Sequence, residues 1–217
     1  RLIKNNWILI VSCLLFSFLT VYPQLVLQYK LATNYKGVQR LISDDELYYL
    51  ARGNEIIEEN QNGNPYFHEL KYKPTVQFFF PEYITVKPLA LLGFSVTQIY
   101  FFYDIFLTFV IGLLTYISFW YLTNSKFLSL SGMWLLIFGV FFFFFNRSVS
   151  PQLNFVFFLT EFIFLTKLIK SEGKNGLYFW FSLINFGFLF YVYVYFWTFY
   201  FVFLFISGLC LCFFDYK

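Results

Sequence analysis

Three consecutive carboxylates, Asp44, Asp45 and Glu46, are the side chains in this sequence best suited to chemistry. Ser43 precedes them, and a serine three residues before a glutamate is typical of the capping box that opens a helix. A carboxylate held there could act as a general base or orient a nucleophile. The same residues also favour the positive end of a helix dipole and cap free amides. Their spacing therefore fits both a catalytic and a purely structural role.

These carboxylates open a predicted helix over residues 43–59, which the Asn and Gly residues of segment 60–64 end. An apolar stripe at helical spacing is expected to face the membrane surface or the protein interior. The predicted stripe comprises Leu47, Leu50, Ala51, Asn54 and Ile57. We therefore predict an amphipathic helix lying on the membrane surface.

The composition places the chain in a membrane. Hydrophobic residues make up 59% of the 217 residues and charged residues 12%, and the mean hydropathy is +0.64. A soluble domain of this length could not remain in solution with that balance. The net charge of +3 is scattered, without a basic run, so we predict no nucleic-acid partner. The three cysteines lie in apolar stretches, which favours buried thiols over disulfides.

The fold class predicted is an all-α polytopic membrane protein with about six transmembrane helices in one domain, residues 1–217. Each apolar run is near the ~20 residues that a bilayer requires. The predicted spans are residues 7–26, 99–122, 127–145, 153–169, 177–195 and 196–214. The last two are nearly continuous, so a hairpin, a kinked span and a re-entrant segment all remain open. The chain starts without Met and stops after an apolar run, so we expect part of a longer protein.

One long polar loop separates the first span, within residues 1–27, from the remaining spans, within residues 96–217. Residues 28–95 hold 7 of the 15 Lys and Arg residues and 8 of the 12 Asp and Glu residues. Short connections rich in Lys and Arg usually face the cytoplasm. Arg1, Lys4, Lys126, Lys167, Lys170, Lys174 and Lys217 all fall on one predicted side. This pattern predicts a cytoplasmic N-terminus and an extracytoplasmic loop.

Five further residues are candidates for function. Asp104 and Glu161 lie within predicted spans, where a carboxylate should face the bundle interior or a polar cavity. Arg147 lies in a short outer connection and could bind a lipid phosphate, although arginines also simply snorkel to headgroups. His68 and Glu82 lie in the loop. A loop histidine more often makes ordinary hydrogen bonds than acts as a catalytic base.

The segment Ser43-Asp44-Asp45-Glu46-Leu47-Tyr48-Tyr49 after a first span resembles the first outer loop of GT-C superfamily glycosyltransferases. That group includes protein O-mannosyltransferases, aminoarabinose transferases and oligosaccharyltransferase catalytic subunits. The resemblance implies sugar transfer from a polyprenyl-phosphate lipid to an unidentified acceptor, in contact with membrane lipids, and points to a bacterial plasma membrane. By this resemblance Asp45 is the catalytic carboxylate, Asp44 is the alternative position for that carboxylate, and Glu46 is its neighbour. Arg147 is then the residue expected to bind the donor phosphate.

The sequence departs from that family by lacking further spans and a C-terminal outer domain. Oligosaccharyltransferase-like members use a divalent cation, but no residues here have convincing ligand spacing, so the metal stays unknown. Two other functions remain open. A transporter or flippase would use Asp104 and Glu161 along a path through the bundle, and an assembly subunit would need neither those residues nor the loop carboxylates.

Overall fold

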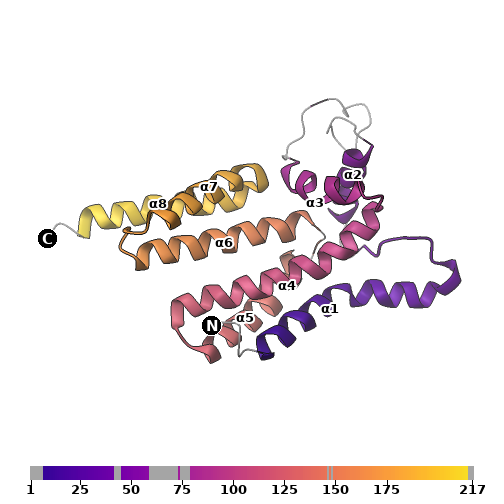
Figure 1. Ribbon diagram of the computed structural model, residues 1–217, viewed down its shortest axis with the longest axis horizontal. Helices are drawn as coiled ribbons and strands as arrows, with labels where there is room; N and C mark the ends of the chain where they lie inside the picture. The colour runs from indigo at the N-terminus through magenta and orange to yellow at the C-terminus, as the bar shows by residue number, and fades with distance from the viewer. Residues whose placement is uncertain are drawn as a thin grey trace.

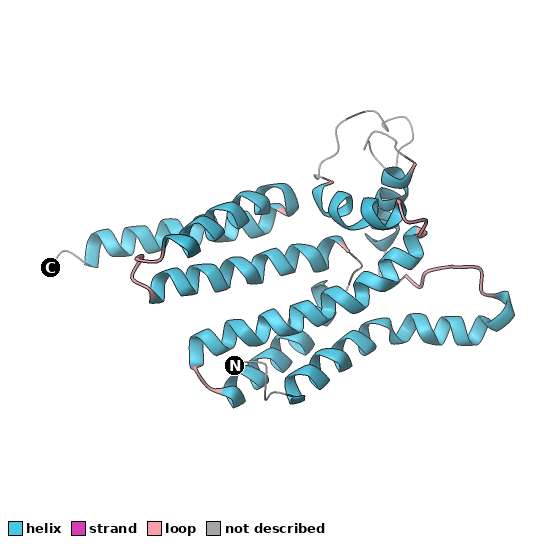
Figure 2. Cartoon of the chain, in the orientation of Figure 1, coloured by secondary structure: helices cyan, strands magenta, loops and turns pink. Residues whose placement is uncertain are grey.

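The computed structural model describes residues 7–41, 45–58, 73, 79–145, 147 and 149–214. Within this part of the chain, all regular structure is helical, as the sequence predicts (Figure 2). The α-helices are α1 (Trp7–Leu31), α2 (Asp45–Ile57), α3 (Phe80–Ala90), α4 (Val96–Thr123), α5 (Lys126–Leu136), α6 (Ser150–Lys170), α7 (Gly176–Val192) and α8 (Val194–Phe214). A short 3-10 turn follows α1 at Ala32–Asn34, and a π-helix continues α5 over Ile137–Phe145.

Helix α4 is the centre of the bundle. It packs against α1, α5 and α6, while α7 packs against α6 and α8 against α7. Close approach is possible because small residues face large ones: a Cβ on Gly112 would lie 3.0 Å from the Cys13 sulfur, and one on Gly132 would lie 2.7 Å from the Phe119 ring. Figure 1 shows α2 and α3 together at one end of the long helices.

Three helices are long and apolar enough to cross a membrane: Trp7–Asn34, Val96–Thr123 and Ser150–Lys170. The other apolar helical segments whose side chains are described are Lys126–Phe142, Gly176–Val192 and Val194–Cys210. The six predicted spans thus correspond to six apolar helices, and within the described residues three of them are long and apolar enough to cross a membrane.

Local capping explains where these helices begin and end. Ser95 and Gln98 form a capping box at the start of α4, with the Ser95 amide donating to Gln98 Oε1 at 2.9 Å. Asn124 ends α4 in the left-handed conformation, with φ of 52°, a conformation that Asn tolerates better than most residues. The next residue, Ser125, caps α5 by accepting from the Leu128 amide.

The nearly continuous apolar stretch 177–214 forms two helices. Tyr193 is extended, with φ of −154° and ψ of 124°, and separates α7 from α8. The Phe190 and Trp197 rings stack across this break with centroids 4.8 Å apart. Helix α8 then runs back along α7 (Figure 1). Of the three arrangements that the sequence left open, the structure therefore has the tight hairpin.

Cationic residues gather at the end of the bundle opposite α2 and α3. Lys126 begins α5, and Lys167 lies in the last turn of α6. The Lys167 ammonium lies over the rings of Tyr121 and Tyr178, 4.9 and 4.7 Å from their centroids. These contacts bring the end of α4, the end of α6 and the start of α7 together. Of the cationic residues predicted on one side, Lys126 and Lys167 therefore share one end of the bundle, whereas Arg1, Lys4 and Lys217 lie outside the described residues.

Helix α2 is held on α3 by a buried ion pair between Arg52 and Glu82. Arg52 Nε and Nη2 donate to Glu82 Oε1 and Oε2 at 2.7 and 2.9 Å, and both side chains are almost completely buried. The guanidinium also lies 4.3 Å from the centroid of the Phe79 ring and donates to the Tyr48 hydroxyl at 3.0 Å. Burial alone would lower the pKa of Arg52, but the hydrogen bonds and charge of Glu82 outweigh it and raise the pKa.

The face of α2 that packs into the protein differs from the predicted apolar stripe, of which Leu50 and Ile57 are only partly buried. The buried residues are Glu46, Tyr49, Arg52, Gly53 and Ile56, whereas Leu47 is 52% exposed. Helix α2 packs on α3 and α4 through a face that contains two charged residues, because Arg52 finds its partner on α3. Gly53 permits the contact with α4, since a Cβ there would lie 2.9 Å from the Tyr100 hydroxyl.

We expect Glu82→Leu to destabilise the docking of α2 by about 3–5 kcal/mol, because it leaves the Arg52 charge buried and unpaired. The double variant Arg52→Leu/Glu82→Leu should lose much less, because no charge remains buried. Amide hydrogen exchange along α2 in detergent or nanodiscs measures the free energy of this opening. Glu172→Gln, which removes an exposed partner of Lys174, is the control and should leave α2 unchanged. Equal losses in the single and double variants would contradict the assignment.

Candidate functional site

The two residues that the sequence placed at a catalytic boundary, Asp45 and Arg147, form an ion pair. They are 102 positions apart, and Arg147 Nη1 donates to Asp45 Oδ2. Asp45 is the first residue of α2, and Arg147 lies between the π-helix and α6. Their side chains are 61% and 27% exposed, so a ligand arriving from the surrounding medium can reach the carboxylate.

The backbone that carries Arg147 is strained. Val149 has a φ of 60°, a left-handed conformation that is unusual for a β-branched residue. Its side chain is fully buried and belongs to the same apolar cluster as Tyr49 and Ile56 of α2. Packing against α2 therefore offsets the strain and fixes the turn that presents Arg147. Strain of this kind is concentrated at functional sites.

Tyr49 lies within electrostatic reach of the ion pair. Burial raises the pKa of its hydroxyl, the charge of Arg147 opposes this shift, and the charges of Tyr193 and Asp45 add to it. The hydroxyl therefore remains protonated and can act as a donor. The Tyr49 carbonyl accepts from the Tyr100 hydroxyl at 2.5 Å, which anchors this part of α2 on α4.

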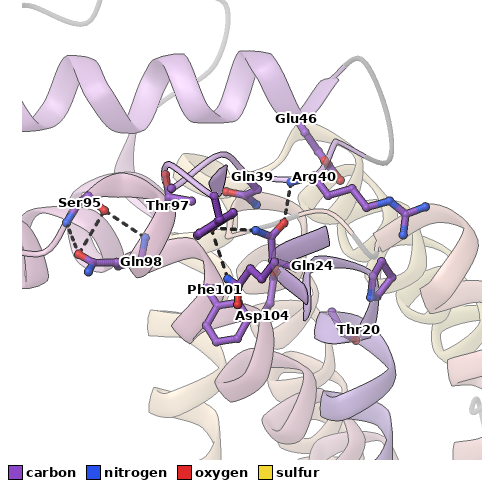
Figure 3. A pocket seen from close by; sticks show the side chains of 14 residues that line it. Thr20, Gln24, Gln39, Arg40, Glu46, Ser95, Thr97, Gln98, Phe101 and Asp104 are labelled. Carbon is purple, nitrogen blue, oxygen red and sulfur yellow. Dashed lines mark hydrogen bonds between the residues drawn. The ribbon is translucent and has the colours of Figure 1, made fainter. Parts of the chain in front are cut away.

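A polar cavity of about 360 Å³ lies beside the start of α2 (Figure 3). Its walls come from the second half of α1, the connection between α1 and α2, the first residues of α2 and the start of α4. The polar side chains that line it include Gln24, Gln28, Gln39, Glu46, Gln98 and Asp104. Small-molecule pockets typically have volumes of about 300–1,000 Å³, so this cavity is at the small end of that range.

Gln24 holds one wall of the cavity. Its side-chain amide donates to the Val38 carbonyl at 2.9 Å and to the Tyr35 hydroxyl at 3.1 Å. Its side-chain oxygen accepts from the Arg40 backbone amide at 2.6 Å (Figure 3). Gln28 donates to the same tyrosine hydroxyl at 3.3 Å. One turn of α1 therefore fixes the connection that leads to α2.

Adjacent carboxylates of α2 face different surroundings. Glu46 is buried, with 3% of its surface exposed, and lines the cavity, whereas Asp45 is exposed and pairs with Arg147. Asp104 lines the same cavity from α4 and accepts from Gln152 at 2.8 Å. Because Gln152 lies in the first turn of α6, this bond connects the cavity to the turn that carries Arg147.

The structure separates the remaining candidates from this site. Glu82 is paired with Arg52 and serves the packing of α2. Glu161 accepts from Ser182 at 2.5 Å and from Asn185 at 2.9 Å, in a contact between α6 and α7. It lies nine residues beyond Gln152, roughly 13.5 Å along the helix at ~1.5 Å per residue. Asp44 and His68 lie outside the described residues.

The described residues include no group of three or more His, Cys, Asp or Glu side chains arranged to hold a metal ion. Glu46 and Asp104 nevertheless line one cavity, and carboxylate oxygens are ligands for hard divalent cations. Two carboxylates with neighbouring amides supply fewer charged ligands than a divalent cation usually has.

Sequence reasoning missed the glutamines that build the cavity. Their signal was present: Gln24 and Gln28 are one helical turn apart at the end of an apolar run, and Gln39 follows in the loop. Gln98 was also readable as part of a Ser-x-x-Gln capping box. Periodicity could not show that these separate segments enclose one space.

Comparison of the chain with models of known protein families, with curated proteins and with solved structures gives no match.

The contact between Asp45 and Arg147 can be tested by cross-linking. In a background with Cys13, Cys210 and Cys212 changed to Ser, Asp45→Cys/Arg147→Cys should form an intramolecular link with a thiol-specific reagent long enough to span this pair. The link is detected by mass spectrometry of the digested protein. Asn54→Cys/Arg147→Cys is the control, because Asn54 is exposed outside the buried face of α2. Equal linking in both pairs, or none at residue 45, would contradict the site.

Proposed function

We propose that the chain belongs to an integral membrane glycosyltransferase that moves a sugar from a polyprenyl-phosphate donor to an acceptor at the extracytoplasmic membrane face. The observation that carries this proposal is the Asp45–Arg147 ion pair beside a polar cavity at the end of an apolar bundle. A carboxylate, a guanidinium and a small-molecule cavity are thereby gathered where a lipid-held donor and a water-borne acceptor can meet.

In this proposal Asp45 accepts the proton of the acceptor hydroxyl. The acceptor oxygen attacks the anomeric carbon, the bond between that carbon and the phosphate oxygen breaks, and polyprenyl phosphate leaves with the electron pair. The sugar is inverted at its anomeric centre. The Asp45 side chain is 61% exposed and therefore accessible to an acceptor hydroxyl, as a general base requires.

Arg147 stabilises the phosphate as it leaves. A guanidinium has five N–H donors in a planar fork, so it can bind a phosphate while it keeps one contact with Asp45. The strained turn at Val149 and its packing on α2 hold the guanidinium in place before the donor arrives. Such preorganised positive charge is effective because it needs no rearrangement during the reaction.

In the proposed membrane arrangement, all six apolar helices cross the bilayer and α2 and α3 lie on the extracytoplasmic side. The shortest, α7, has 17 residues, which at ~1.5 Å per residue gives ~25 Å against a hydrocarbon core of ~30 Å. The lysines at the opposite end support a cytoplasmic location for that end, by the positive-inside rule. The donor phosphate would then lie at the headgroup level beside Arg147.

A transport function has less support. It would need Asp104 and Glu161 along one path, but Asp104 lines the cavity at one end of α4 and Glu161 is bound by Ser182 and Asn185 of α7. An assembly role without chemistry leaves the Asp45–Arg147 pair and the cavity without a purpose.

Transfer of labelled sugar from polyprenyl-phosphate donors tests the proposal directly. Asp45→Asn in membranes holding the protein should lower the rate by about 10²–10⁴-fold, the usual contribution of a general base. Glu172→Gln, an exposed residue at the opposite end, is the matched control and should retain full activity. Asp44→Asn is measured in parallel. Loss with Asp44→Asn alone would move the base to that residue, and full activity in both variants would overturn the assignment.

A further inference from the structure

We infer that the end of the bundle opposite α2 and α3 binds the headgroups of anionic phospholipids. The turn between α4 and α5 and the turn between α6 and α7 lie together at this end (Figure 1). They carry four lysines, which we call the lysine surface: Lys126, Lys167, Lys170 and Lys174. Arg147 precedes the first residue of α6 and Lys170 is its last, so lipid binding here does not depend on the proposed sugar transfer.

Tyr121, near the end of α4, joins two of these lysines into one patch. The Lys167 ammonium lies over the rings of Tyr121 and Tyr178, 4.9 and 4.7 Å from their centroids. The Lys170 ammonium donates to the backbone carbonyl of the same Tyr121. Because one tyrosine contacts both ammonium groups, their charges add at one place and can act on one headgroup.

Positive charge dominates the lysine surface. Within residues 120–130 and 166–180, the four lysines accompany a single acidic residue, Glu172, which pairs with Lys174. Two helices end here and two begin, so their terminal partial charges of about −0.5 and about +0.5 roughly cancel. The side chains therefore set the sign of the electrostatic potential at this end.

The ammonium groups are accessible to a ligand. Lys126, Lys170 and Lys174 are exposed, and Lys167 is half-buried between its two rings. An ammonium has three N–H donors, so Lys170 can bind a phosphate oxygen while it keeps its bond to the Tyr121 carbonyl. The surface can thus accept an anion without breaking the contacts that hold the helices together.

Exposed apolar side chains beside the lysines favour a lipid as the occupant. Phe127 directly follows one lysine and is 76% exposed, and Ile169 directly precedes another and is 67% exposed. Trp180, in the second turn of α7, is also exposed, and tryptophan is enriched where a membrane meets water. A free phosphate would leave these side chains in water. A phospholipid contacts them with its acyl chains while its phosphate meets the lysines.

The excess of positive charge also selects among lipids. Phosphatidylglycerol has one net negative charge, whereas the choline cation of phosphatidylcholine offsets its phosphate. Each lysine near a membrane surface strengthens attraction to anionic lipid about fivefold. The lysine surface therefore prefers phosphatidylglycerol to phosphatidylcholine.

Lipid titration followed by native mass spectrometry tests this inference. The full chain in detergent is titrated with dioleoylphosphatidylglycerol and, separately, with dioleoylphosphatidylcholine, and the dissociation constant of the first bound lipid is measured. We expect the anionic lipid to bind at least about tenfold more tightly. Lys170→Gln/Lys174→Gln should weaken its binding about 25-fold, at about fivefold per lysine. Lys30→Gln/Lys36→Gln, which removes two exposed lysines near the other end, is the control and should keep the tight binding.

Equal affinities of the unmodified chain for the two lipids would overturn the inference, and this comparison needs no variant to fold. Unchanged binding in Lys170→Gln/Lys174→Gln, or an equal loss in the control, would overturn it as well, because the lysine surface would then have no special role. Glycerol 3-phosphate at the concentration of the lipid is added as a soluble competitor and should not displace it. Displacement would assign the surface to soluble anions and overturn the lipid assignment.

Discussion

The orientation of α2 depends on the buried contact between Arg52 and Glu82. A guanidinium and a carboxylate removed from water are tolerated only when each satisfies the other, so α2 cannot rotate or slide without exposing an unpaired charge to the interior. Asp45 and Glu46 lie on the same rigid helix, within two turns of Arg52. This ion pair therefore decides which carboxylate faces the cavity and which faces Arg147.

Helix α4 transmits this orientation to the bundle. Tyr100 donates to the backbone of α2, Gly53 permits the close approach, and one turn further along Asp104 lines the cavity and accepts from α6. In a membrane such contacts cannot rely on the exclusion of water between helices, so close packing and hydrogen bonds must hold the helices together. Hydrogen bonds thus connect α2, α4 and α6 at the polar end of the bundle.

The sequence predicted the helices well because long apolar runs need few other signals: the predicted 99–122 and 153–169 lie within the observed α4 and α6. It did not predict the buried face of α2. Hydrophobic periodicity assigns the charged residues Arg52 and Glu46 to the aqueous side, and it cannot indicate that Glu82 of α3 pairs with Arg52. It named Asp45 and Arg147 separately, from a resemblance and from charge at a boundary. Their contact depends on a strained turn at Val149 that no local pattern shows.

The same limit explains the cavity. Each of its glutamines is ordinary in isolation, and only the bonds of Gln24 to the chain around Val38 and Arg40 turn a loop into a wall. Two neighbouring carboxylates then acquire opposite surroundings, one in contact with a cation and one buried among amides. Helical geometry alone separates them, so a single turn of α2 places two carboxylates in different surroundings. This separation makes the docking of α2 on α3 and α4 the condition on which the surroundings of both carboxylates depend.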